Sequence, residues 1–341
     1  MKTPVISALI DTYNHERYIE QAIVSVIDQD FPAQEMEIVV VDDGSTDRTP
    51  EIVRKFQPRV RLLRKKNGGQ ASAFNAGFGE SRGQLIALLD GDDWWAKGKL
   101  AAVVDAFERN PEDAAVSHAY YEVRENPGEA RLCGPGEEEV LNLRSPESAS
   151  AARDHWHFLL PCALTVRRTV LEKVIPIPEI LVFSADGPIA ATSMAMGVRV
   201  LPQGLSCYRV HSANLNAIDE GDVAKTRRKY EIGAAMFEIV QQMLVRQGVP
   251  SECVAALLDR PRVHASRIIL SSGGSRLKAF ETEMRSFHCE YKNPTLSYRL
   301  FKYVVVGAAT LLLPPQQFYK MRNWYARRNL ARVREEFARS R

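Results

Sequence analysis

The chain has 341 residues, of which 45% are apolar and 26% charged, and its net charge of +3 by itself indicates no class of partner. This composition is typical of a globular protein with room for a catalytic domain and an appendage. The five cysteines include no Cys-x-x-Cys pair, so neither a disulfide framework nor a zinc site is expected. A basic-then-apolar signal region and an apolar run of roughly 20 residues are both missing, so we expect a cytoplasmic protein.

The first ninety residues alternate between two kinds of apolar pattern. Short buried-strand runs occupy residues 5–10, 37–41, 60–63 and 85–89. Between them, apolar residues three and four positions apart predict helices over 18–27, from about residue 48, and over 71–79. This β-α-β-α-β order predicts an α/β fold with a mostly parallel, twisted sheet flanked by helices.

Polar residues follow each predicted strand at its carboxyl end. They fall in the segments 11–14, 42–43, 67–70 and 90–93. In a parallel sheet these ends share one edge, where ligands gather. The sequence therefore predicts one ligand site built from four loops.

Three carboxylates, Asp90, Asp92 and Asp93, lie within four positions after the fourth strand. Buried like charges at this spacing repel one another, and a hard divalent cation would neutralise them. Mg²⁺ and Mn²⁺ take oxygen ligands and usually share them with phosphates, so a phosphorylated ligand is implied as well. The alternative is an acidic turn in which one Asp caps the next helix.

The motifs as an ordered set resemble the inverting glycosyltransferases of family 2, which have the GT-A fold. The resemblance covers roughly residues 4–216. It is carried by Asp-Thr-Tyr-Asn at 11–14, Asp-Asp-Gly-Ser-Thr-Asp at 42–47, Asn-Gly-Gly at 67–69 with Asn-Ala-Gly at 75–77, Asp-Gly-Asp-Asp at 90–93, Ser-Ala-Asp at 184–186, and Tyr-Arg-Val-His at 208–211 with Asn214.

The resemblance implies a set of donor-site residues. Asp43 would accept a proton from a pyrimidine imide, Tyr13 would stack on the base, and Asp90 would face the ribose. Asp42 suits a turn role as well as a ligand role. The residues implied for nucleotide binding are Asp11, Tyr13, Asp42, Asp43, Asn67, Gly69, Asp90 and Gly91.

The resemblance also implies the chemical groups of a transferase. Asp92 and His211 would hold Mn²⁺ or Mg²⁺ against the diphosphate, and Arg209 would add positive charge from the same loop as His211. Trp94 and Trp95 are candidates for contact with donor or acceptor, although core packing suits one of them.

Asp186 is the implied general base. The family usually has Glu-Asp at this point, and here Ala185 replaces the Glu. The alternative reading is a cap residue, whose pKa a helix N-terminus would lower.

After residue 216 the alternation stops and helical patterns cover 222–247, 251–270 and 276–288. We therefore expect a catalytic domain over 1–216 and a helical region over 217–341. Residues 296–341 carry ten Lys and Arg against two Glu, a local charge of +8, around the apolar stretch 303–313. That pattern suits peripheral membrane contact on the inner face of the cell membrane, or else packing within the chain or in a homodimer. No nucleic-acid motif accompanies the charge.

The sequence as a whole favours an enzyme that moves a sugar from a nucleoside-diphosphate sugar, UDP ahead of GDP and TDP, to a glycan or lipid-linked acceptor with inversion. A role in bacterial surface polysaccharide synthesis follows from the resemblance. Two alternatives stay open, a sugar nucleotidyltransferase and a non-catalytic nucleotide-sugar binder. The first lacks a Gly-rich, basic triphosphate loop after the first strand, and the second does not need the candidate base.

Overall fold

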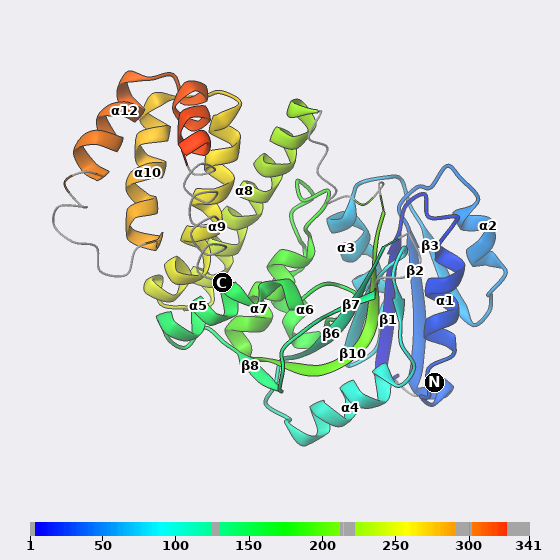
Figure 1. The fold of residues 1–341 in the computed structure, drawn as a ribbon. Coiled ribbons are helices and arrows are strands. Elements are labelled where there is room, and N and C mark those ends of the chain that lie inside the picture. The colour runs from blue at the N-terminus through cyan, green and yellow to red at the C-terminus, as the bar shows by residue number, and fades with distance from the viewer. Residues whose placement is uncertain are drawn as a thin grey trace, which may run out of the picture. The chain divides into compact units, whose positions relative to one another are not determined.

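The computed structural model describes residues 4–124, 130–211, 214, 222–290, 300 and 302–325. The chain forms two compact units, the first made of residues 1–217 and 238–257 and the second of residues 218–237 and 258–341. The expected domain boundary after residue 216 lies outside the described residues. Figure 1 shows the sheet, which belongs to the first unit, and the helices of both units.

Ten strands form one sheet in the order β3-β2-β1-β4-β9-β6-β10-β5, with β7 beside β6 and β8 beside β10. The strands are β1 (Ile6–Thr12), β2 (Met36–Asp42), β3 (Val60–Arg64), β4 (Leu85–Asp90), β5 (Trp94–Trp95), β6 (Ala115–Arg124), β7 (Ala130–Cys133), β8 (Glu139–Leu141), β9 (Thr165–Arg167) and β10 (Val198–Val210).

The direction of the strands determines where the loops that carry the predicted site residues meet. Parallel pairing joins β1 to β2 and β4, β2 to β3, and β6 to β10. Because β9 is antiparallel to both β4 and β6, the two parallel groups point the same way. All these parallel strands therefore end at one edge of the sheet, as predicted, while β5, β7, β8 and β9 make the sheet mixed.

Helices cover both faces of the sheet. Among the described residues up to 211 they are α1 (Ile19–Ile27), α2 (Thr49–Arg54), α3 (Gln70–Glu80), α4 (Lys99–Arg109), α5 (Pro146–Asp154), α6 (Arg168–Val174) and α7 (Asp186–Met196), with 3-10 turns η1 (Ala33–Glu35) and η2 (Trp156–Phe158). Alternate residues of β1 face opposite sides, as a pleated strand requires. Ile6, Ala8 and Ile10 share a buried cluster with α1 and α4, whereas Leu9 lies against α3.

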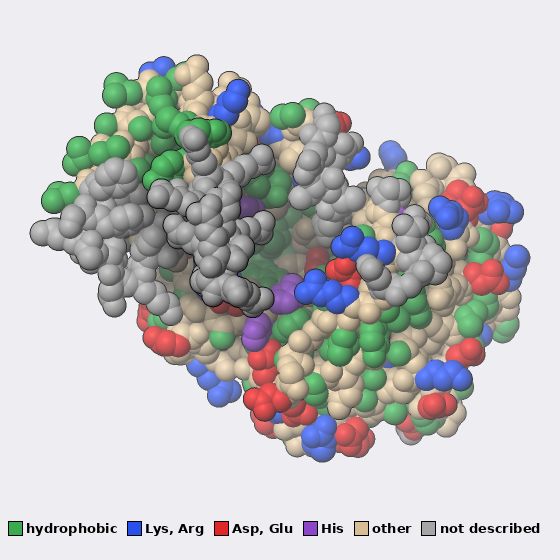
Figure 2. Space-filling model, viewed as in Figure 1, with side chains coloured by type: hydrophobic (Ala, Val, Ile, Leu, Met, Phe, Trp, Pro, Cys, Tyr) green, Lys and Arg blue, Asp and Glu red, His purple; other side chains and the backbone are tan. Residues whose placement is uncertain are grey.

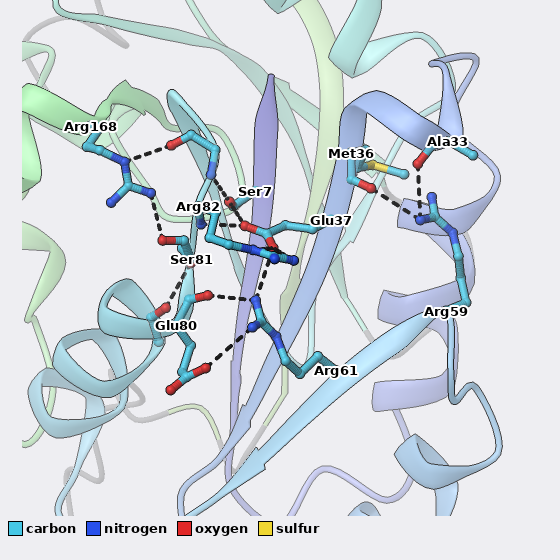
Figure 3. A network of polar contacts seen from close by, with 12 residues as sticks. Ser7, Ala33, Met36, Glu37, Arg59, Arg61, Glu80, Ser81, Arg82 and Arg168 are labelled. Carbon is cyan, nitrogen blue, oxygen red and sulfur yellow. Dashed lines mark hydrogen bonds and ion pairs between the residues drawn. The ribbon is translucent and has the colours of Figure 1, made fainter. Parts of the chain in front are cut away.

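The edge opposite the functional loops is closed by a polar network around Glu37 of β2 (Figure 3). The Glu37 carboxylate accepts hydrogen bonds from Ser7 and from the backbone and side chain of Arg82, and Arg61 forms a further ion pair at 3.0 Å. Burial pushes the pKa of Glu37 upward, but these hydrogen bonds outweigh it and the pKa lies below its usual value. The charged form of Glu37 therefore stabilises this edge.

Glu37→Gln is expected to destabilise the fold by about 1–2 kcal/mol at neutral pH, because a hydrogen bond to a charged group is worth roughly 1.5–3 kcal/mol and exposure of the arginines reduces that. Since the folded-state pKa is depressed, the stabilisation is present above the unfolded-state pKa and is lost as pH falls through the folded-state value. Thermal unfolding of wild type and Glu37→Gln from neutral to acid pH measures this loss of stability. Glu51→Gln, which removes an exposed pair with Arg54, is the control and should melt like wild type.

The helices of the C-terminal region confirm the predicted helical segments. They are α8 (Val223–Arg246), α9 (Ser251–Ser271), α10 (Arg276–Glu290), the π-helical turn η3 (Lys302–Val306) and α12 (Gly307–Leu312). Residues 315–325 are also helical. In the second unit Glu283 is fully buried and its carboxylate accepts two hydrogen bonds from Arg267, which compensates the burial of its charge. Across the described residues we find no helix whose length and apolar character would let it span a bilayer.

Candidate active site

The candidate site lies where the parallel strands end. Asp11 of β1 is paired in register with Asp90 of β4 on one side, and Thr12 with Asp42 of β2 on the other. The parallel pairing of β10 with β6 brings Arg209 to the same edge, and Arg209 donates its backbone N–H to Asp93 at 2.7 Å. The sheet thus brings together residues that lie about two hundred positions apart in the sequence.

The acidic residues at this edge strongly affect one another. Burial raises the pKa of Asp11 to about 7, and the charges of Asp92 and Asp186 add to the effect. Burial, followed by the charges of Asp11 and Asp93, also raises the pKa of Asp90 well above its usual range. Asp92 differs, because hydrogen bonding from His211 and the nearby His15 outweigh burial and lower its pKa. The negative charge is therefore concentrated on Asp92.

The donor set fits a hard divalent cation. Oxygens of Asp90, Asp92 and Asp93 lie within 4.8 Å of one another. Nε2 of His211 is 3.0 Å from Oδ2 of Asp92, and Nε2 of His15 is 3.9 Å from the same oxygen. Carboxylate oxygens with an imidazole are ligands that Mn²⁺ accepts, and Mg²⁺ prefers the oxygens. A bound cation would relieve the repulsion that raises the pKa of Asp90.

The Arg209 guanidinium is held by the protein itself. It lies 4.7 Å from the ring centre of Tyr18 and 4.5 Å from that of Trp94, so it sits between two aromatic rings. It also donates to the backbone carbonyl of Asp92 at 2.8 Å and to Gln21 at 2.6 Å. Arg209 therefore fixes the turn that carries Asp92 and Asp93.

The two tryptophans of β5 have different surroundings. Trp94 is half-buried beside Arg209, whereas Trp95 is 3% exposed and belongs to the apolar core. The ammonium group of the buried Lys99 lies 4.0 Å from the centre of one Trp95 ring. Only Trp94 is therefore placed where it can meet a substrate.

The carboxylates after β2 hold the neighbouring loops. Asp42 is fully buried, accepts from the backbone N–H of Ser45 and pairs with Arg64 at 3.0 Å. Asp43 accepts from Lys65 at 2.7 Å and from the backbone N–H groups of residues 68 and 69. Asp42 thus links the loop after β2 to the end of β3, and Asp43 orders the loop after β3.

The remaining nucleotide-site candidates are more open or are backbone positions. Tyr13 is 42% exposed at the rim, and Asn67 is also exposed. Gly91 donates its backbone N–H to the carbonyl of Asp11 at 2.9 Å, and a Cβ atom there would lie 2.6 Å from Oγ1 of Thr12. A larger residue than glycine cannot occupy position 91 without displacing β1.

Asp186 is the first residue of α7 and lies two positions after Ser184, whose φ of 59° is left-handed. Burial raises the pKa of Asp186 to about 6 and outweighs the hydrogen bonds from the helix N-terminus. The lowering expected for a cap residue is therefore not found. A carboxylate with a pKa near 6 is poised to accept a proton near neutral pH.

Gln70 links the acidic residues after β4 to the segment that precedes Asp186. It ends the polar segment 67–70 but belongs to none of the motifs that carry the family resemblance. Its side-chain nitrogen donates to Oδ1 of Asp90 at 3.1 Å, and its side-chain oxygen accepts from the backbone N–H of Ala185 at 3.0 Å. Its own backbone N–H donates to the carbonyl of Val182 at 3.0 Å. One side chain thus links the acidic cluster to the residue before Asp186.

Helix α3 holds the rest of the segment before Asp186 in the same way. Ser72 donates to Glu179, and the Asn75 side chain exchanges two hydrogen bonds with the backbone of Ile177. Gly69 has a φ of 83°, and a Cβ atom there would lie 2.5 Å from Cα of Val182. The glycine and asparagine of the 67–77 motif therefore position residues 177–185, which we call the base segment.

Two further residues join the site without having been predicted. His15 lies beside Asp92, and its backbone N–H donates to Thr49 at 2.9 Å. The Tyr18 ring packs on that of His211 at 4.9 Å. His15 directly follows the 11–14 motif and Tyr18 lies four positions after it, so a histidine and an aromatic residue just beyond the motif are the only sequence signal for them.

Sequence comparison places the chain among known proteins. The profile of Glycosyl transferase family 2 matches residues 7–175. An uncharacterised glycosyltransferase of Nostoc sp. is 33% identical over 253 residues, which cover 71% of this chain and 76% of that protein. The poly(ribitol-phosphate) β-N-acetylglucosaminyltransferase TarS of Staphylococcus aureus is 38% identical over 106 residues, covering 29% of this chain and 18% of TarS.

Solved structures share the fold. TarS residues 1–349 in complex with UDP superimpose with a TM-score of 0.55 at 19% identity, covering 89% of this chain and 90% of that one. The mannosyltransferase PcManGT of Pyrobaculum calidifontis, in complex with GDP-Man and Mn²⁺, has a TM-score of 0.52 at 20% identity and covers 96% and 88%. The fold is that of the GT-A glycosyltransferases, and the chain belongs to glycosyltransferase family 2.

Proposed function

We propose that this glycosyltransferase moves a sugar from a nucleoside-diphosphate sugar to an acceptor hydroxyl with inversion, assisted by Mn²⁺ or Mg²⁺. The observation that carries the proposal is the Gln70 bridge, which places the segment of the candidate base Asp186 one side chain away from Asp90. Such a reaction needs positive charge at the departing diphosphate and a base at the acceptor. The two requirements match the two groups that Gln70 joins.

The residues take distinct roles in this mechanism. Asp92, with Asp90 and His211 beside it, would hold the cation, whose charge would stabilise the departing diphosphate. Asp186 takes the proton of the acceptor hydroxyl, and the oxygen attacks the anomeric carbon from the face opposite the diphosphate. A single displacement of this kind inverts the configuration.

We propose UDP as the nucleotide of the donor, ahead of GDP and TDP. The exposed Tyr13 ring is available to stack on a base, and Asp11 lies between the strand ends that carry Asp42 and Asp90. TarS, which shares the fold, was solved with UDP, whereas PcManGT was solved with GDP-Man. Thermal-shift titration with UDP, GDP and TDP, with Mn²⁺ or EDTA, tests the proposal. It is wrong if GDP or TDP raises the melting temperature more than UDP does, or if no nucleotide raises it in either condition.

We propose a glycan or lipid-linked acceptor in bacterial surface polysaccharide synthesis, at the inner face of the cell membrane. The similarity to TarS, whose name refers to poly(ribitol-phosphate), supports a polymeric acceptor. Residues 296–341 would supply membrane contact, and a homodimer is the competing use of that segment. Residues 296–299, 301 and 326–341 lie outside the described residues.

Gln70→Met is expected to lower kcat by about tenfold or more and to leave the donor KM within about threefold, because small displacements of a reacting group cost up to roughly 10²-fold. The variant keeps the length of the side chain but loses both hydrogen bonds. Gln84→Met, at an exposed glutamine, is the matched control and should behave like wild type. A raised donor KM with unchanged kcat would assign Gln70 to donor binding instead.

A further inference from the structure

The outer surface of η3 and α12 is unusually apolar. Val304 is 64% exposed and Leu312 is 74% exposed, with Tyr303, Val305 and Leu311 also exposed. Figure 2 shows hydrophobic side chains gathered over this part of the second unit, in the upper left of the view. Contiguous exposed apolar side chains of this kind mark interaction surfaces rather than ordinary solvent-facing helices.

The inner surface of the same segment is well packed. Phe318 and Tyr319 are buried in a cluster with Leu270 and Ala279, and Val306, Ala309 and Leu313 pack against that cluster. Gln316 donates to the backbone carbonyl of Ser272 at 2.8 Å. The exposed side chains are therefore the second face of an ordered element.

The helical residues 315–325 continue this division into two faces. Met321, Trp324 and Tyr325 are at least half exposed, while Phe318 and Tyr319 face inward. Trp and Tyr combine an apolar ring with a polar group, which is the combination enriched at membrane–water interfaces. We call the exposed residues of η3, α12 and 315–325 the outer face.

The charge near the outer face favours one kind of binding partner. Residues 300–325 contain Lys302, Lys320 and Arg322 and no acidic residue, within the longer stretch 296–341 whose net charge is +8. Arg322 also forms an ion pair with the buried Glu283 at 3.8 Å, whereas Lys320 is exposed. Two copies of this segment meeting face to face would bring like charges together, whereas anionic lipid headgroups would neutralise them. The charge therefore favours lipid over a second copy of the chain.

We propose that the outer face binds the surface of an anionic lipid bilayer without crossing it. Burying exposed apolar side chains at the headgroup boundary supplies one weak attachment, and each nearby Lys or Arg adds roughly 1 kcal/mol. Together the two give reversible binding. The inference deepens the proposed use of residues 296–341, and it is tested without donor or acceptor, so it can fail while the proposed transfer reaction stands.

The test is cosedimentation of the full-length protein with vesicles of phosphatidylcholine alone or mixed with phosphatidylglycerol. Wild type should bind the mixed vesicles at low salt and be released by high salt, which screens exposed charges. Val304→Glu combined with Leu312→Glu should weaken binding about tenfold or more, since each change removes an apolar side chain worth at least about 1 kcal/mol when buried. Val24→Glu combined with Val245→Glu, at 38% and 54% exposed positions of α1 and α8, adds the same charge, is the matched control and should bind like wild type.

The melting temperature of both variants should match that of wild type, which separates lost lipid contact from misfolding. Wild-type protein that stays in the supernatant with mixed vesicles at low salt would overturn the proposal. So would a double variant that binds vesicles normally but changes from dimer to monomer in light scattering, because the outer face would then be a subunit interface.

Discussion

Asp186→Asn should lower glycosyl transfer by about 10²- to 10⁴-fold at saturating donor, which is the usual contribution of a positioned general base. The amide keeps the shape of the carboxylate but cannot take the acceptor proton. Wild-type activity should fall as the pH drops below about 6, because the Asp186 carboxyl then becomes protonated. Initial rates across pH for wild type and variant measure both effects, and the residual rate of the variant should not show that decline.

The stability of the Asp186→Asn variant is a control, because the direction of its change in melting temperature can be predicted. Burial raises the pKa of Asp186 from 3.8 to about 6, so the folded state binds more protons than the unfolded state between these values. The ionised carboxylate therefore costs stability above that window. Asp186→Asn should melt no lower than wild type at neutral pH and should bind donor normally. Transfer at near wild-type rate would show that another group takes the proton.

Asp92→Asn should weaken Mn²⁺-supported UDP binding by about tenfold or more, because it removes a charged oxygen ligand. The asparagine oxygen can still accept the hydrogen bond that His211 makes to Asp92, so the local fold should persist. The effect should vanish in EDTA, where the cation contributes nothing to either protein. Isothermal titration with UDP in Mn²⁺ and in EDTA measures this dependence.

Asp105→Asn removes an equal charge from an exposed position of α4 and controls for net charge. It should bind UDP like wild type under both conditions. If Asp92→Asn binds UDP as tightly as wild type in Mn²⁺, the cation is held elsewhere or is not used.

The parallel part of the fold is predictable from the sequence because its signals are local. The apolar runs at 37–41 and 85–89 appear as β2 and β4, each extended at its end by an aspartate, and β2 also begins one residue earlier, at Met36. The position of β9 between β4 and β6 is set instead by pairing across distant parts of the chain. A three-residue strand gives too little periodicity for its partner or direction to be inferred.

The candidate site likewise combines residues that local sequence predicts with contacts that only the folded structure reveals. Asp90, Asp92 and Asp186 are visible in the sequence as motifs, and the structure brings their segments to one edge of the sheet. The partners of Arg209 and the bridge made by Gln70 depend on how loops more than a hundred residues apart meet, so no spacing rule could indicate them. The burial that raises the pKa of Asp186 is likewise a property of packing.

The attachment of the base segment to α3 limits how this enzyme can be re-engineered. Gln70, Ser72 and Asn75 of α3 form hydrogen bonds with residues 177–185, and Gly69 lies close against Val182. The backbone N–H groups of residues 68 and 69 in turn donate hydrogen bonds to Asp43. A chimera that exchanges only the nucleotide-side loop with a relative would also shift the proton acceptor. Grafts should therefore move residues 65–75 and 177–186 as one module.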